Sequence, residues 1–404
     1  MERTNKKKAV IGLIILLIAN TSAAGADWCT SALVNISVSF PNIPYSIITL
    51  VNNIPNLCAV VFTIVAGALV NRKISLKNMI LIGTGMHCIG GVLPVLAENS
   101  FSLLMIGRLA FGIGYGIMQG ICISMSFKLV ANEKHRAAAM GWALTAQYST
   151  NMVAQVIVGY LCEIKWNYSF LIYFWSLIPF VVVLLLCPNF PLDKNDRTAF
   201  GGEGSSLGKG ETLIQSLKAM PRSVWIFTII VGVYMFCYYP MFLTIGSIII
   251  GRNFGTSVSI GYAMTFYSVS SLCGGLLFGL LAKRLKHWTL LFSLVGVAIS
   301  SIGIYLAPSY AIICLFLAIG GISSTCILPA CNNAYFAQVP PRRSFLASGI
   351  LLAGLNIGAF FGTPYIALIE ALGGEVYSAL LISPVILVIM GILSVKFSKP
   401  AVIN

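Results

Sequence analysis

Twelve long apolar runs limit the folds open to this chain more than any other feature of the sequence. The hydrocarbon core of a bilayer is about 30 Å thick, and an α-helix needs about 20 apolar residues to cross it. We therefore predict twelve membrane-spanning helices. Their ranges are 9–36, 45–70, 77–97, 101–127, 138–162, 168–187, 223–250, 257–282, 287–307, 310–335, 344–370 and 374–396.

The composition excludes a set of soluble domains, because only 9% of the residues are charged and 58% are hydrophobic. Soluble proteins carry roughly 25% charged residues. The fold class is therefore an all-α polytopic membrane protein, with the lipid bilayer as its surroundings. The net charge of +14 could indicate nucleic-acid binding. That function needs a soluble basic module with interleaved aromatic residues, which the sequence lacks, so no nucleic-acid partner is expected.

The eleven cysteines lie in or beside apolar runs and form no Cys-x-x-Cys pair, so we interpret them as buried hydrophobic residues. We expect no metal and no cofactor.

The N-terminus resembles a secretory signal, with Lys6 to Lys8 before an apolar run. Because that run continues through Cys29 to Ile36, we expect an uncleaved first membrane span. The residues from Phe40 to Pro44 are expected to end it.

The cations predict the topology. Alternate loops between the predicted spans hold 22 of the 25 Lys and Arg residues. The opposite loops hold only Lys165 and Arg252, and Arg108 lies inside a span. Cytoplasmic loops are enriched in Lys and Arg, so both termini are predicted to be cytoplasmic and the protein to reside in the cell membrane.

Two halves are predicted to repeat each other. Residues 1–187 form the first six-helix half, residues 188–222 a cytoplasmic linker, and residues 223–404 the second half. Gly67 and Arg72 recur 212 positions later as Gly279 and Arg284. Such corresponding loops indicate two pseudo-symmetric six-helix bundles. A short surface helix is expected over residues 211–220 of the linker.

Two motifs resemble those of the major facilitator superfamily, and the resemblance covers essentially the whole chain. Residues 67–77 match its Gly-x-x-x-Asp-Arg-x-Gly-Arg-Arg signature at Gly67 and Arg72, with Asn71 in place of Asp. Residues 107–116 match its Gly-Arg-x-x-x-Gly-x-Gly-x-Gly pattern. The resemblance implies transport by alternating access. It also implies a cytoplasmic gate formed by Gly67, Asn71, Arg72, Arg136, Arg284 and Arg343.

Glycines recur at every fourth position in two spans, which predicts helix faces smooth enough for close packing. They are Gly112, Gly116 and Gly120, and Gly354, Gly358 and Gly362.

The chain contains no Gly-Pro dipeptide, which the proton-driven drug antiporters of this superfamily carry in their fifth span. This absence makes drug efflux a less favoured function.

Asp27 and Arg108 are the two ionisable residues placed clearly inside predicted spans. A charge in hydrocarbon costs at least about 2.5–3.5 kcal/mol, so each is a candidate functional residue. At about 1.5 Å per residue, both lie in the outer half of the bilayer. We predict that Asp27 carries a coupling proton, and that Arg108 adjusts the proton affinity of that carboxyl or holds an anionic substrate group. The alternative places Asp27 at the external water interface and pairs Arg108 with a backbone carbonyl.

Further polar and aromatic residues are predicted to line a substrate cavity, with hydrogen bonds between helices as the alternative role. His87 is expected to be structural. The predicted cavity residues are Tyr115, Gln119, Gln147, Asn151, Gln155, Tyr234, Tyr238, Tyr239, Asn332, Asn333 and Asn356.

The sequence thus predicts a monomeric secondary active transporter for a small organic solute, driven by a proton gradient. A single intramembrane Arg favours a neutral or anionic solute. Residues 203–210 lack the first Gly and the final Ser or Thr of a phosphate loop, so ATP drive is not expected. Proton-coupled efflux of drugs or metabolites is the alternative. A polytopic membrane enzyme is a remote alternative, because no acid, base or metal constellation can be assembled, and we predict that the protein is not an enzyme.

Overall fold

The computed structural model of the 404-residue chain describes residues 2–130, 133–193, 218–336, 339 and 344–398. Within these residues the secondary structure is helical, apart from one isolated β-bridge between Val70 and Ile74. The chain divides into two compact units. The first unit contains Met1–Cys29 and Val51–Ser205, and the second contains Thr30–Leu50 and Ser206–Asn404.

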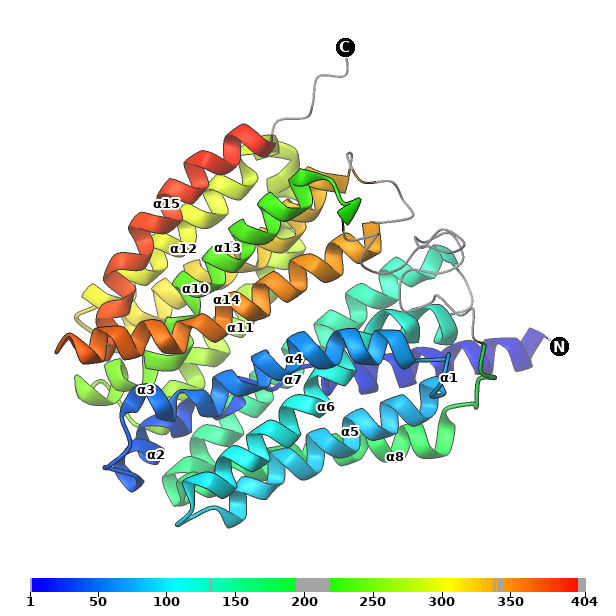
Figure 1. Ribbon diagram of the computed structural model, residues 1–404, viewed down its shortest axis with the longest axis horizontal. Helices are drawn as coiled ribbons and strands as arrows, with labels where there is room; N and C mark the ends of the chain where they lie inside the picture. The colour runs from blue at the N-terminus through cyan, green and yellow to red at the C-terminus, as the bar shows by residue number, and fades with distance from the viewer. Residues whose placement is uncertain (1, 131–132, 194–217, 337–338, 340–343, 399–404) are drawn as a thin grey trace. The chain divides into compact units, whose positions relative to one another are not determined.

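The helices of the first unit are α1 (Glu2–Thr21), α4 (Leu50–Leu69), α5 (Leu76–Val92), η2 (Leu93–Leu96), α6 (Phe101–Leu129), α7 (Glu133–Ile164), η3 (Trp166–Ser176) and α8 (Leu177–Leu186). Figure 1 labels the α-helices of the first unit, and the 3₁₀-helices η2 and η3 carry no label there. A 3₁₀-helix, η1 (Trp28–Ala32), spans the point where the chain passes into the second unit.

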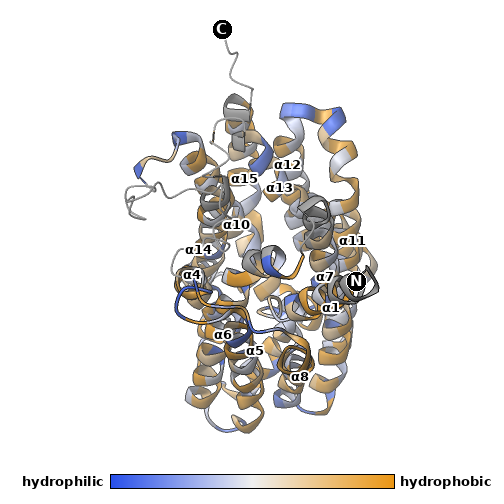
Figure 2. Ribbon diagram, turned by 90° about the vertical axis from the view of Figure 1, so that its right-hand side faces the viewer, coloured by the Kyte–Doolittle hydropathy of each residue, from blue (hydrophilic) through white to orange (hydrophobic). Residues whose placement is uncertain are grey.

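The second unit begins with α2 (Leu33–Ser39) and α3 (Tyr45–Ile48) and continues after the linker. The later helices are α10 (Arg222–Gly251), α11 (Ser257–Leu285), η5 (Lys286–Trp288), α12 (Thr289–Leu306), α13 (Tyr310–Phe336), α14 (Ser344–Ala371), η6 (Val376–Ser378) and α15 (Ala379–Ser398). In Figure 2 most of the length of the described helices is hydrophobic, as expected for membrane-spanning segments.

Each of the twelve predicted ranges falls on helical structure. Nine helical stretches of the described residues are long and apolar enough to cross a membrane, and one of them, Ser257–Leu306, contains both α11 and α12. The α7 helix is not among the nine, and α1 contributes only the shorter apolar segment Val10–Thr21. The number of twelve crossings therefore stays a prediction.

The first span is not one continuous helix over residues 9–36, so that expectation was wrong. The α1 helix ends at Thr21, and helical structure resumes at Trp28. Gly25 between them has a φ of 106°, which glycine adopts without steric cost and which interrupts a right-handed helix. The predicted break at Phe40 to Pro44 is confirmed, because α2 ends at Ser39 and α3 begins at Tyr45.

The glycine faces pack as predicted. A Cβ atom on Gly120 of α6 would overlap the carbonyl oxygen of Thr63 in α4, and one on Gly358 of α14 would overlap that of Gly232 in α10. These helices therefore approach backbone to backbone, which only residues without a side chain permit. Figure 1 shows α10 and α14 next to each other in the second unit.

The segment from α2 to α3 packs within the second unit. Both carboxylate oxygens of Glu370 accept hydrogen bonds from successive backbone N–H groups, those of Tyr45 at 3.1 Å and Ser46 at 3.2 Å. The Tyr45 hydroxyl donates to the carbonyl of Leu243 at 2.7 Å.

The predicted division into residues 1–187 and 223–404 stays a prediction. Residues 211–217 of the expected helix over 211–220 lie outside the described residues.

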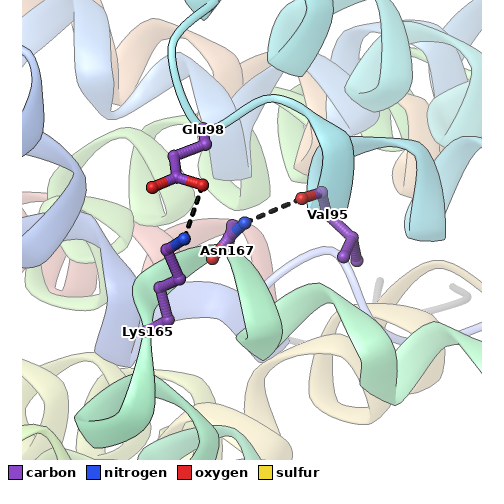
Figure 3. Close-up of polar contacts among 4 residues, drawn as sticks. All are labelled: Val95, Glu98, Lys165 and Asn167. Carbon is purple, nitrogen blue, oxygen red and sulfur yellow. Dashed lines mark hydrogen bonds and ion pairs between the residues drawn. The ribbon is translucent and has the colours of Figure 1, made fainter.

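The two cations predicted for the opposite loops both make local contacts. Lys165, between α7 and η3, forms an ion pair with Glu98, as Figure 3 shows. Beside it, Asn167 donates to the carbonyl of Val95 at 2.7 Å, which fastens the start of η3 to η2 (Figure 3). Arg252 donates to the carbonyl of Tyr305 at 2.7 Å.

Candidate functional site

The predicted site around Asp27 lies in the first unit, where the first span is unwound. Four consecutive carbonyl groups of the unwound segment each accept a hydrogen bond from a side chain of a different helix. The pairs are Ala24 with His87 of α5 (3.0 Å), Gly25 with Tyr173 of η3 (2.7 Å), Ala26 with Arg108 of α6 (2.9 Å) and Asp27 with Gln155 of α7 (2.9 Å). A carbonyl without a partner in hydrocarbon costs several kcal/mol. These side chains therefore make the break in the helix tolerable.

Arg108 is fully buried and held by protein atoms. Its Nε donates to the carbonyl of Val51, its Nη2 to that of Ala26 and its Nη1 to the Tyr173 hydroxyl at 3.0 Å. The guanidinium carbon lies 4.4 Å from the centre of the Phe111 ring. The structure thus contains the backbone pairing that the sequence left as an alternative for Arg108. Charge-assisted hydrogen bonds and ring faces together compensate the buried charge.

Tyr173 connects Arg108 to the unwound segment, because its hydroxyl accepts from the guanidinium and donates to Gly25. The Cys29 thiol also contacts this hydroxyl at 3.6 Å, and the ring stacks on Trp28 at 5.3 Å between centroids. Sequence reasoning missed Tyr173. The same span also contains Tyr168, and a tyrosine there could equally be a membrane-interface residue.

His87 was expected to be structural, and its two ring nitrogens have different partners. Nε2 donates to the carbonyl of Ala24, and Nδ1 forms a hydrogen bond with the Ser176 hydroxyl. Since a carbonyl can only accept, the proton must lie on Nε2. His87 therefore fixes the start of the unwound segment against α5 and the end of η3.

The polar stripe of α7 contacts the first span along its length. Gln147 donates to Asn20 at 3.4 Å, Asn151 accepts from the Trp28 indole, and Gln155 donates to the carbonyl of Asp27. The three side chains therefore share one helix face, as their spacing indicates. They form hydrogen bonds between helices, and their predicted role as a cavity wall stays a prediction.

The tertiary structure brings Asp27 of the unwound segment close to Tyr115 and Gln119 of α6. All three side chains are half-buried. The Tyr115 hydroxyl is hydrogen-bonded to Gln119 and lies within the electrostatic reach of the Asp27 carboxylate. A carboxyl group beside polar side chains at a break in a membrane helix is chemically able to bind and release a proton.

The predicted cavity residues of the second unit lie in different surroundings. Tyr234, Tyr238 and Tyr239 of α10 are buried, and Tyr234 stacks on Tyr238 at 5.9 Å between ring centroids. Asn356 of α14 is buried and donates to the carbonyl of Leu352 one turn earlier, at 3.2 Å. In α13, Asn332 is half-buried and Asn333 is exposed.

The predicted gate residues are only partly described. Gly67 and Asn71 are buried, Arg72 is half-buried and Arg284 is exposed. Asn71 has a φ of 60°, a left-handed conformation that asparagine adopts more readily than most residues. Its N–H donates to the carbonyl of Ile74 at 2.7 Å, closing the turn after α4. Arg343 and the Arg136 side chain lie outside the described part of the chain.

Two solved structures of transporters have a similar fold. A POT family transporter in complex with 5-aminolevulinic acid superposes with a TM-score of 0.74 at 12% sequence identity, covering 96% of each chain. A bacterial homologue of the human lysosomal transporter Spinster, in an inward-facing and occupied conformation, gives a TM-score of 0.64 at 14% identity, covering 98% of this chain and 96% of that one. These likenesses establish the fold of a membrane transporter.

The sequence comparisons identify the family. The sequence profile of the Major Facilitator Superfamily matches residues 15–249 and 232–402. The chain belongs to this superfamily, and nine helical stretches of its described residues are long and apolar enough to cross a membrane. An uncharacterized transporter of Rickettsia bellii (strain RML369-C) is 22% identical over 244 residues. That match covers 59% of this chain and 56% of the relative, so the chain spans about half the length of the curated relative that it matches.

Proposed function

We propose that this transporter moves a small organic solute, neutral or anionic, across the cell membrane by alternating access, coupled to protons. The observation that carries the proposal is the unwound first span at Asp27, with its carbonyl groups bound by four other helices. Irregular backbone at membrane depth occurs where it is buried in protein or lines a water-filled cavity, and broken helices of transporters form substrate and ion sites.

In this proposal Asp27 carries the proton. Its half-buried side chain lies beside Tyr115 and directly after the carbonyl that binds Arg108. A nearby cation favours the ionised carboxylate, whereas loss of water disfavours it. Opening and closing of the water path to Asp27 would therefore change its proton affinity, which is what coupling requires.

Arg108 acts in the proposal mainly as a positioning residue. Three of its N–H groups are already bound to Val51, Ala26 and Tyr173. Direct contact with a substrate carboxylate would use the remaining N–H groups or replace one of these bonds. The POT family transporter of similar fold binds 5-aminolevulinic acid, so amino acids and short organic acids come first among the solutes to be tested.

The test is solute uptake into proteoliposomes containing the purified full-length protein, with and without a pH gradient. The solutes are organic acids, amino acids, sugars and lipophilic cations. We expect the gradient to drive accumulation of an acid or a neutral solute. In Asp27→Asn, accumulation should fall at least about tenfold while exchange of labelled for unlabelled solute persists, since a fixed neutral group cannot release a proton. The matched control is Glu375→Gln, an exposed carboxylate on the second unit.

Several outcomes would contradict the proposal. Flux that is indifferent to the pH gradient would remove the coupling role of Asp27. Gradient-driven export of lipophilic cations alone would support drug efflux instead. Covalent product formation without movement of solute would indicate an enzyme. If Arg108→Lys transports anions normally, Arg108 does not bind a substrate carboxylate, because Lys cannot reproduce a two-point contact.

A further inference from the structure

A second candidate site lies in the second unit, away from the unwound span. A cavity of about 300 Å³ opens where the end of α11, the short η5 helix, the start of α12 and the end of α13 meet. Its polar lining comes from Lys286, His287, Thr289 and Asn333, and its apolar lining includes Phe278 and Leu290. This volume is at the lower end of the range for small-molecule pockets, so it suits a compact polar group rather than a large ligand.

The charge around this cavity is positive. Lys286 is exposed and His287 is half-buried in its wall, and Lys283 and Arg284 are exposed on the last turn of α11. None of the described residues that line the cavity is acidic. Clustered cations without counter-charges attract an anion and raise its local concentration.

The backbone at Lys286 is fixed in an unusual conformation. Lys286 ends α11 with φ 50° and ψ −121°, a region that residues other than glycine seldom adopt. Its carbonyl accepts a hydrogen bond from the Thr289 hydroxyl at 2.7 Å, which pins the turn. Strained residues of this kind persist where the surrounding structure holds them and are frequent at binding sites. The turn thus keeps the lysine at the cavity.

The cavity also has an apolar part and an aromatic neighbour. Phe278 of α11 and Leu290 of α12 contribute to its apolar lining. Trp288 is 44% exposed beside His287, and tryptophan is enriched where tails meet headgroups. Figure 2 shows the ends of α11 and α12 joined by a hydrophilic turn above their hydrophobic lengths.

We propose that this cavity binds the phosphate headgroup of an anionic phospholipid. Lys286 and His287 would donate to the phosphate, and Thr289 and Asn333 would contact the polar part of the headgroup. The acyl chains would begin at Phe278 and Trp288. Basic pockets between membrane helices are known to bind anionic headgroups. The cations, the apolar lining and the exposed Trp288 beside the cavity favour a lipid over a soluble phosphate compound, which would gain nothing from apolar contacts.

The test measures lipid binding to the full-length protein in detergent by native mass spectrometry and by thermal unfolding. The probes are phosphatidylglycerol, phosphatidylcholine and glycerol 3-phosphate. We expect phosphatidylglycerol to remain bound and to raise the unfolding temperature, with little effect of the other two. Lys286→Gln should weaken phosphatidylglycerol binding about fivefold, the effect of one basic residue near an anionic headgroup.

Lys286→Gly separates binding from folding, because glycine accepts the backbone conformation of this turn while removing the charge. It should lose the same binding as Lys286→Gln and unfold no earlier than the wild type without lipid. Lys73→Gln is the matched control, an exposed lysine in the turn after α4. Unchanged phosphatidylglycerol affinity in both Lys286 variants would overturn the proposal. So would equal binding of phosphatidylcholine, or binding of glycerol 3-phosphate as tight as that of the lipid.

Discussion

Tyr173 is the residue on which the hydrogen bonds of the unwound span depend most. Its hydroxyl donates to Gly25 and accepts from Arg108, so one oxygen atom serves two elements that are distant in sequence. The neighbouring His87, Gln155 and Arg108 each bind a single carbonyl of the segment from Ala24 to Asp27. Loss of Tyr173 would therefore leave two groups short of a partner.

We predict that Tyr173→Phe lowers the stability of the protein by about 1–3 kcal/mol, the cost of leaving buried hydrogen-bonding groups without a partner. The measurement is the unfolding temperature of the purified protein in detergent. Tyr168→Phe is the control, because Tyr168 lies in the same η3 helix, is 37% exposed and has its ring 6.0 Å from the Lys165 ammonium. Equal unfolding temperatures for the two variants would show that the Tyr173 hydroxyl contributes little.

At the scale of the helix, faces formed by glycines hold pairs of helices together. In α14, Gly358 packs against Gly232 of α10, whereas Gly349 has no atom within 4 Å of the position of an added Cβ. Both glycines lie in the same helix, and only one of them is at the contact. They therefore separate the effect of packing from that of helix propensity.

We predict opposite results for alanine at these two positions. Gly358→Ala should lower the unfolding temperature, because its methyl group would overlap the α10 backbone and overpacking typically costs about 1–3 kcal/mol. Gly349→Ala should leave it unchanged or raise it, since alanine is favoured over glycine in helices by up to about 1 kcal/mol. Thermal unfolding of the two variants under one condition decides the matter. A stable Gly358→Ala protein would mean that α10 and α14 can separate without loss.

Whole-molecule topology follows from the distribution of cations. With 22 of 25 Lys and Arg residues in alternate loops, both termini and the linker are predicted to face the cytoplasm. Reporters fused to truncated chains in a bacterium can check this orientation. Green fluorescent protein should fluoresce after residues 193 and 404, and alkaline phosphatase should be active after residues 165 and 252. Phosphatase activity after residue 193 would contradict the predicted orientation.

Much of the fold could be predicted because it depends on local patterns. The length of each apolar run determines where helices form, and each of the twelve predicted ranges contains a helix, although the first range is interrupted between Thr21 and Trp28. The break after Ser39 follows from Pro41 and Pro44, and the close packing of α6 and α14 follows from glycines at every fourth position. The break at Gly25 was not predicted, because the hydropathy of an apolar run with small residues indicates a continuous helix.

The candidate site was predicted only in part. Asp27 and Arg108 stood out because charges are rare in membrane spans. The partners of Arg108 could not be predicted, since carbonyl groups carry no sequence signal. Tyr173 also went unnoticed, because nothing in its own span marks it.

The sequence by itself determined where most helices lie, the superfamily and the two charged candidate residues, because hydropathy, motif spacing and charge are properties of short segments. Only the tertiary structure decided that the first span unwinds and which side chains bind its carbonyl groups. The bond between His87 and Ala24 joins residues 63 positions apart, and that between Tyr173 and Gly25 joins residues 148 apart. A helix can break inside a membrane only where distant helices supply the missing hydrogen bonds, and the folded chain alone brings those helices together.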